Sequence, residues 1–159
     1  MYSVITPDGS RVAFGVVVSA MQVRRPVYIA DVASGVVREL CGDCNGRPRD
    51  WLFDGRQLVV ERFSSLNSVA VVDKATATQR ELLQVPDLSI TDPRVSPDGQ
   101  WITFSAGRRE RAPSVYVASL RATEAIPQDE WVEIDREVNH PFWSPDGRMV
   151  YFVSGAGFG

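Results

Sequence analysis

Short apolar stretches recur along the chain, separated by polar segments that contain Gly and Pro. Four of them begin three residues after the glycine of an Asp-Gly pair: Val12-Ala13-Phe14, Leu58-Val59-Val60, Ile102-Thr103-Phe104 and Val150-Tyr151-Phe152. Their shortness and their β-branched and aromatic content favour strands over helices. No stretch of about a dozen residues keeps the apolar spacing of an amphipathic helix between the Gly and Pro positions. The pattern therefore predicts an all-β protein.

The Asp-Gly pairs form an internal repeat. Their aspartates stand at positions 8, 54, 98 and 146, which are 46, 44 and 48 residues apart. Proline fixes φ in a turn, Asp accepts a hydrogen bond from the backbone two residues on, and Gly tolerates the positive φ of a tight reversal. We predict structural hairpin turns at Pro7-Asp8-Gly9, Phe53-Asp54-Gly55, Ser96-Pro97-Asp98-Gly99 and Ser144-Pro145-Asp146-Gly147.

Two further elements recur after the strand that follows each turn. The first is an apolar stretch that ends in Asp or Ser, at Val27–Asp31, Val69–Asp73 and Val115–Ser119. The second lies at Val36–Leu40, Gln79–Leu83 and, more weakly marked, Trp131–Ile134. A segment with an aromatic or apolar side chain precedes the turns, as at Trp51, Val95 and Trp143. Each complete repeat therefore predicts four short strands.

Four antiparallel strands per 44 to 48 residues are typical of a propeller blade, because a four-stranded sheet must bury both faces against neighbouring blades. We predict a partial β-propeller of three four-stranded antiparallel blades plus the first two strands of a fourth. The predicted domain covers residues 1–159, with blades at about 1–42, 46–87 and 90–136 and a half blade at 139–154.

This number of blades does not close a ring, since propellers have roughly four to eight blades. An open arc exposes an apolar sheet face at each end, and such patches mark interfaces. We expect the chain to be part of a longer protein that supplies additional blades. The alternative is a homodimer, in which two copies of three and a half blades sum to seven.

The repeats resemble the WD40-like (PD40-type) propeller repeats of TolB and its relatives. Those repeats carry Ser-Pro-Asp-Gly, then a strand of the Ile-Ala-Phe type, then a Tyr-Val-x-Asp strand. The resemblance covers nearly the whole chain and is strongest at Ser96–Phe104, Val115–Val117 and Pro141–Phe152. It is weakest at Leu52–Gly55 and Arg121–Asp135, where parts of the pattern are missing.

The resemblance implies two classes of function. In the first, the chain is a non-catalytic protein-binding or scaffold module of a larger sensor or signalling protein, with blade-edge loops and the axial opening as binding surfaces. In the second, it is the propeller of a prolyl-oligopeptidase-like serine hydrolase and filters access to a separate catalytic domain. We favour the first, because no catalytic set is visible in these residues.

The net charge of −3 is too small to indicate a nucleic-acid or membrane surface. No apolar run approaches the roughly 20 residues of a membrane helix, and no export signal is visible. We expect a protein or peptide partner and no cofactor. The resemblance and the paired cysteines favour an extracytoplasmic setting in a bacterium.

Cys41 and Cys44 form a C-x-x-C pair just before a predicted blade boundary. A structural zinc site needs about four ligands, but the single histidine, His140, lies far along the chain, and redox pairs of the thioredoxin type begin a helix. We expect a disulfide or paired thiols that stiffen this loop. Free thiols are the main alternative, and metal or redox chemistry is less favoured.

Candidate catalytic residues are few. His140 is expected near a blade junction rather than in a triad, since the chain has no G-x-S-x-G elbow. Trp51 and Trp143 are expected in the core, whereas Trp101 and Trp131 are expected to be partly exposed. The four turn aspartates repeat once per blade, so local hydrogen bonding explains them.

Arginines cluster between the second and third strands of two predicted blades. They are Arg24 and Arg25 in the first blade, and Arg108, Arg109 and Arg111 in the third. Arginine forms bidentate pairs with carboxylates and is enriched at interfaces. We treat these residues as a candidate binding rim for an acidic peptide or a carboxylate, with an ordinary solvated loop as the alternative.

Overall fold

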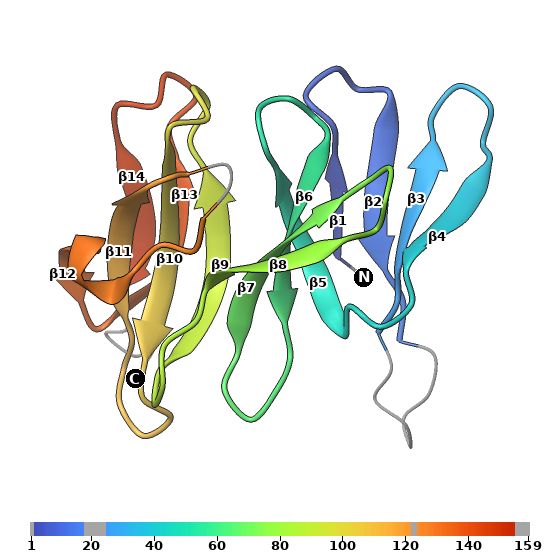
Figure 1. Ribbon diagram of the computed structural model, residues 1–159. Helices are drawn as coiled ribbons and strands as arrows, with labels where there is room; N and C mark the ends of the chain where they lie inside the picture. The colour runs from blue at the N-terminus through green and yellow to red at the C-terminus, as the bar shows by residue number, and fades with distance from the viewer. Residues whose placement is uncertain (1, 18–24, 122–123, 155–159) are drawn as a thin grey trace.

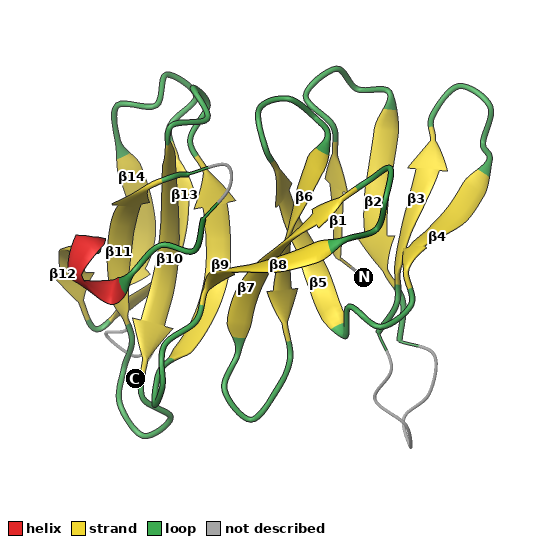
Figure 2. Ribbon diagram, viewed as in Figure 1, coloured by secondary structure: helices red, strands yellow, loops and turns green. Residues whose placement is uncertain are grey.

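The computed structural model describes residues 2–17, 25–121 and 124–154. Within these ranges, fourteen strands form four antiparallel sheets of four, four, four and two strands (Figure 1). The one helical element of the described part is a 3₁₀ turn, η1 at Gln128–Glu130 (Figure 2). The predicted fold class, three four-stranded antiparallel blades and the first two strands of a fourth, is confirmed.

Each sheet follows chain order from its inner to its outer strand. The first blade contains β1 (Tyr2–Ile5), β2 (Arg11–Gly15), β3 (Val27–Asp31) and β4 (Val37–Cys41). The second contains β5 (Gly46–Trp51), β6 (Gln57–Arg62), β7 (Ser68–Asp73) and β8 (Gln79–Leu83). The third contains β9 (Ser89–Val95), β10 (Trp101–Gly107), β11 (Ser114–Ser119) and β12 (Val132–Arg136), and the last contains β13 (Val138–Trp143) and β14 (Val150–Ser154).

The sheets stand side by side in an arc (Figure 1). The inner strands meet along the axis, where β5 packs against β1 and β9, and β13 packs against β9. The turns between β1 and β2, β5 and β6, β9 and β10, and β13 and β14 share one edge of the arc, the top edge in Figure 1. Equivalent parts of the repeat therefore lie at equivalent places in space.

The Asp-Gly turns have a common backbone geometry. Each glycine N–H donates to the carbonyl three residues earlier at 2.8 to 2.9 Å. The glycines adopt φ values of 59° to 72°, a conformation that costs a residue with a Cβ about 1 kcal/mol or more. The glycines are Gly9, Gly55, Gly99 and Gly147. Glycine at this place thus fixes the hairpin that starts each blade.

The core lies between the blades, and the strand Leu58-Val59-Val60 shows why apolar runs are continuous. Leu58 and Val60 belong to the hydrophobic cluster between the first and second blades, which includes Ala13. Val59 belongs to the cluster between the second and third blades, which includes Ile102. Because successive side chains of a strand point to opposite faces, a blade with two covered faces needs apolar residues at every position.

The structure corrects two details of the sequence interpretation. Trp131 caps η1 rather than lying in β12, and its ring packs on Phe104 with centroids 4.7 Å apart. Trp51 is buried as predicted, but Trp143 is only partly buried. Trp143 lies in a sheet of two strands, whereas the sheet that contains Trp51 has four, so its own blade provides less cover.

Candidate functional site

Three inner strands carry a β-bulge near the middle of their length. The register with the second strand shifts between Pro48 and Asp50 in β5, between Thr91 and Arg94 in β9, and between Asn139 and Phe142 in β13. Proline has no N–H to donate, and each shift lies at a proline: Pro48, Pro93 and Pro141. A bulge turns neighbouring side chains in a new direction.

The bulges direct charged side chains toward the axis. Asp92 and His140 adopt positive φ values of 54° and 52°, each directly before a proline. Together with Arg49 they line a hollow of about 620 Å³ between the inner strands, which we call the axial pocket. Its other lining residues include Tyr2 of β1, Arg47 of β5, Arg94 of β9 and Phe142 of β13. Every inner strand of the arc contributes to this pocket.

A buried charge network supports the pocket. The Arg49 guanidinium donates from Nε to Glu61 at 2.6 Å and lies 2.9 Å from Asp92 Oδ1. The Asp92 N–H donates to the same Glu61 carboxylate at 3.1 Å. All three residues are buried, and they come from three strands in two blades. Removing one partner of such a network typically costs about 3 to 5 kcal/mol, because it leaves an uncompensated buried charge.

His140 joins this network from the last sheet. Its Nδ1 lies 3.0 Å from Asp92 Oδ2, while its side chain stays 65% exposed toward the pocket. The pocket lining also includes the polar side chains of Thr91 and Asn67. The arrangement offers hydrogen-bond donors, carboxylates and the exposed Phe142 ring, which are the means of binding a polar chain.

Hydrogen bonds between blades fix the inner strands. The indoles of Trp51 and Trp143 donate to the carbonyls of Val4 and Arg94 in the preceding blade, at 3.4 and 3.1 Å. Asp50 accepts a bond from the Val95 N–H of the following blade at 2.9 Å. Burial raises the pKa of the Asp50 carboxyl, although the backbone N–H groups of Val95 and Trp51 oppose the rise. These hydrogen bonds therefore connect the inner strands of neighbouring blades along the axis.

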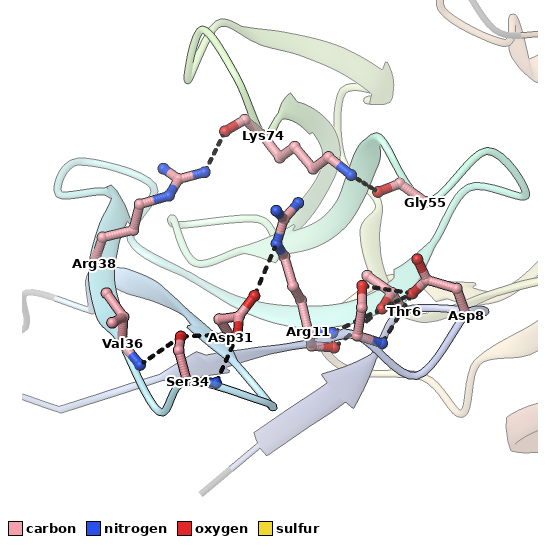
Figure 3. A network of polar contacts seen from close by, with 10 residues as sticks. Thr6, Asp8, Arg11, Asp31, Ser34, Val36, Arg38, Gly55 and Lys74 are labelled. Atoms are coloured by element: carbon pink, nitrogen blue, oxygen red, sulfur yellow. Dashed lines mark hydrogen bonds and ion pairs between the residues drawn. The ribbon is translucent and has the colours of Figure 1, made fainter.

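The turn edge carries a second polar network, drawn in Figure 3. Asp31 accepts from the Ser34 N–H at 2.9 Å, within the first blade. Arg38 then reaches the Lys74 carbonyl of the second blade at 2.6 Å, and Lys74 Nζ donates to the Gly55 carbonyl at 2.7 Å. These contacts lie within one blade or connect two neighbouring blades, so we assign them a structural role.

Cys41 and Cys44 are joined by a disulfide, and both are buried. The bond lies in the connection between β4 and β5, and the Gln79 amide donates to Asp43 in the same loop at 2.9 Å. Among the described residues, no group of three or more His, Cys, Asp or Glu is placed to hold a metal ion. The disulfide therefore closes a short loop at the connection between the first and second blades.

The structure places the described members of the predicted arginine rim at two hollows. Arg24 lies outside the described residues. Arg25 faces the junction of the first two blades, where its guanidinium carbon lies 4.1 Å from the centre of the Phe63 ring. Arg108, Arg109 and Arg111 line a different hollow of about 440 Å³, together with Leu66, Asp87 and Glu110. The two arginine groups therefore face separate hollows.

The sequence analysis did not predict that Arg49, Glu61 and Asp92 lie at the axis. Glu61 directly follows the apolar run Leu58-Val59-Val60 in β6, and Arg49 belongs to a short segment with several charged residues. The prolines were the available sign, since proline inside a strand marks a bulge or an edge. Asp92-Pro93 and His140-Pro141 both stand six residues before a turn aspartate, counted from Asp92 and His140.

Comparison with known proteins agrees with this geometry. No family model matches the chain. A putative TolB from Agrobacterium tumefaciens superimposes with a TM-score of 0.73 over 98% of this chain, at 19% identity. TolB from Acinetobacter baumannii gives a TM-score of 0.68 over 96%, and a prolyl endopeptidase gives 0.65 over 87%, both at 18% identity. The chain thus has the fold of a TolB-like β-propeller.

One curated relative also matches. It is an uncharacterized peptidase of Bacillus subtilis, YuxL, which is 36% identical over 69 residues. The match covers 43% of this chain but 10% of that protein, and this chain covers 55% and 37% of the two TolB chains and 22% of the prolyl endopeptidase.

Within the described residues, no helix is long and apolar enough to span a membrane.

Proposed function

We propose that this chain is the binding part of a PD40-type β-propeller, in which residues 1–159 form one incomplete propeller domain. It captures a protein or peptide at the axial pocket and performs no catalysis. The observation that carries the proposal is the pocket itself, where bulged inner strands bring charged and aromatic side chains into one hollow. Binding is supported by the chemistry of the lining, which offers hydrogen-bond donors and acceptors beside an aromatic ring.

Further blades or a second copy of the chain complete the ring in this proposal. The Cys41–Cys44 disulfide supports an oxidising, extracytoplasmic compartment, since disulfides are rare in reducing cytosol.

The proposal is tested by selecting, from a random library, peptides that bind this protein. Peptides from a random library that bind the chain are measured again on His140→Ala and Phe142→Ala, whose side chains are 65% and 50% exposed and carry little of the core. We expect each variant to weaken binding at least about fivefold, which corresponds to about 1 kcal/mol. Arg148→Ala, on the exposed turn edge, is the control and is expected to bind as the unchanged chain does. Equal affinity for all three variants would place binding elsewhere and refute the axial pocket.

A second candidate function is the propeller of a prolyl-oligopeptidase-like hydrolase. The observation that favours it is the 36% identity with the Bacillus subtilis peptidase over 69 residues. The sequence of the full-length protein decides between the two functions. A following α/β-hydrolase segment with a nucleophile elbow would support the hydrolase, whereas further blades or an upstream signalling module would support the binding module.

A further inference from the structure

Two arginines and two aromatic rings lie together at the junction of the first and second blades. The guanidinium carbon of Arg25 lies 4.1 Å from the centre of the Phe63 ring. That of Arg47 lies 4.6 Å from the Phe63 centre and 4.1 Å from the Tyr2 centre. Such contacts engage the flat face of a guanidinium and leave its N–H groups for other acceptors. We call these four residues the arginine–aromatic stack.

Within the part of the chain that the structure describes, no Asp or Glu pairs with the two arginines of this stack. Six other arginines of the described residues form ion pairs with Asp or Glu, and neither Arg25 nor Arg47 is among them. The Nε of Arg25 is buried without a hydrogen-bond acceptor in the structure. No Asp or Glu occurs in residues 15–27, so the adjoining sequence offers none. A buried cationic donor without an acceptor is costly, and an incoming anion removes that cost.

A hollow of about 380 Å³ lies beside the stack. Arg25, Arg47 and Tyr2 line it together with Val16 and Val17, which supply apolar surface. Tyr2 and Arg47 also line the axial pocket, so the two hollows share a wall. For a peptide bound along the axis, this smaller hollow is an adjoining site in which two guanidinium groups lie beside apolar surface.

The backbone around the stack is fixed before any ligand arrives. The Gly46 N–H donates to the Arg25 carbonyl at 3.3 Å, and the Phe63 N–H donates to the Asn45 carbonyl at 2.9 Å. The Asn45 amide returns a bond to the Phe63 carbonyl at 2.8 Å. A Cβ on Gly46 would lie 2.5 Å from the Glu61 carbonyl oxygen, so this close approach requires glycine. Preorganised groups bind with less loss of conformational entropy.

We propose that the arginine–aromatic stack is a carboxylate-binding site, which holds a free C-terminal carboxylate or an acidic side chain of a bound peptide. Two guanidinium groups pair with the two carboxylate oxygens, and Val16 and Val17 accept the apolar part of the residue that carries them. The inference rests on the proposed function, because it specifies which peptide the axial binding module selects. It differs from the sequence-based rim in its members, since Arg47 takes part and Arg108, Arg109 and Arg111 do not.

NMR titration of the arginine Nε–H signals tests the site with defined probes. Ac-Gly-Gly-Val-OH supplies a terminal carboxylate and Ac-Gly-Gly-Glu-NH₂ a side-chain carboxylate, while Ac-Gly-Gly-Val-NH₂ and Ac-Gly-Gly-Gln-NH₂ are their neutral counterparts. We expect saturable shifts of the Arg25 and Arg47 signals with at least one acidic probe. The neutral probes are expected to bind at least about tenfold more weakly. The acidic probe that binds more tightly identifies the source of the carboxylate.

Conservative variants complete the test. Arg25→Lys and Arg47→Lys keep the positive charge but lose the planar set of guanidinium N–H donors. Each is therefore expected to weaken the binding of the acidic probe at least about tenfold. Arg148→Lys, on the turn edge, is expected to change nothing, and urea unfolding verifies that all variants fold. Equal binding of acidic and neutral probes, or unchanged binding by both stack variants, would overturn the carboxylate site. Library peptides that still depend on His140 and Phe142 would then leave the proposed function standing.

Discussion

Single hydroxyl groups close three of the four Asp-Gly turns. Ser96 Oγ donates to Asp98 at 2.5 Å and accepts from the Trp101 N–H at 2.9 Å, so one group bonds both arms of the hairpin. Thr6 and Ser144 make the same pair of bonds in their turns. In the second blade Leu52 takes this place and its side chain joins the core instead. The turn therefore tolerates loss of the hydroxyl, at a cost in hydrogen bonds.

Replacing Ser96 measures that cost. Ser96→Ala is expected to lower the free energy of unfolding by about 1 to 2 kcal/mol, because the buried hydroxyl makes two hydrogen bonds. The midpoint of urea unfolding checks this value. Ser119→Ala, at the exposed end of β11, is the matched control and should change stability by less than about 0.5 kcal/mol. Equal effects of the two substitutions would contradict a specific role of the Ser96 hydroxyl.

The turn carboxylates predict a response to acid. Hydroxyl donors, above all, hold the pKa of Asp8, Asp98 and Asp146 below the usual range. The folded state then binds protons less readily than the unfolded chain, whose aspartates titrate near about 3.9. The stabilisation is complete above that pH and is lost as the pH falls toward the lowered values. We expect the urea midpoint to fall steeply below about pH 4.

Asp98→Asn separates this effect from general acid unfolding. The difference in stability between the unchanged chain and Asp98→Asn should shrink as the pH falls from 7 to 2.5. The reason is that both side chains are uncharged once Asp98 is protonated. A difference that stayed constant over this range would show that the charge of Asp98 does not contribute.

At the scale of elements, the inner strands behave as one unit. Arg49 of β5 pairs with Glu61 of its own blade and with Asp92 of β9, so the charges that line the axis also join two blades. A charge at the surface of a sheet does not have this role. Arg56 and Asp73 form such a pair, and the Arg56 side chain is 63% exposed.

Arg49→Met tests the difference. It leaves Glu61 and Asp92 buried without their guanidinium, and we expect a loss of about 3 kcal/mol in the free energy of unfolding. Arg56→Met breaks an exposed pair and should cost less than about 1 kcal/mol. The double variant Arg49→Met/Glu61→Met should recover part of the loss, since apolar replacements of a buried pair are often tolerated. Equal losses for Arg49→Met and Arg56→Met, measured by urea unfolding, would rule out the buried network as a stabilising link.

The sequence predicts the turns and strands well but does not predict which residues meet at the axis, and the reason is physical. Turns such as Ser96–Gly99 are local, because their hydrogen bonds join residues two to five positions apart. Strands follow from apolar runs that need two covered faces. Arg49 and Asp92, by contrast, meet only because bulges in different strands turn toward each other, and a single repeat contains no sign of its neighbour. The partnership of Arg25 and Phe63 likewise depends on how two blades dock.

At the scale of the whole molecule, the two end sheets present unusual surfaces. Tyr151 of β14 is 44% exposed, whereas the residues at the same place after the other turns, Ala13, Val59 and Thr103, are fully buried by the next blade. Phe142 stacks on Tyr151 with ring centres 5.3 Å apart, and Val153 is 52% exposed beside them. This face has the composition of a blade interface without the following blade.

The opposite end carries the complementary surface. Phe14 and Tyr28 stack with ring centres 5.7 Å apart and are partly exposed. In the third blade, Phe104 and Tyr116 form the equivalent stack at 5.9 Å, and there Phe104 is fully buried against the second blade. The end with Tyr151 in one copy therefore matches the end with Phe14 in another, as consecutive blades match within the chain.

This match predicts head-to-tail association of the isolated chain. Apolar patches of this kind usually mark interfaces, so we expect the mass measured by sedimentation velocity to rise with concentration. Tyr151→Glu/Val153→Glu places two charges in the joint and should shift association to at least about tenfold higher concentration. Val36→Glu, 64% exposed next to β4, is the control and should leave association unchanged. A species that stays monomeric at every concentration and unfolds cooperatively would contradict association.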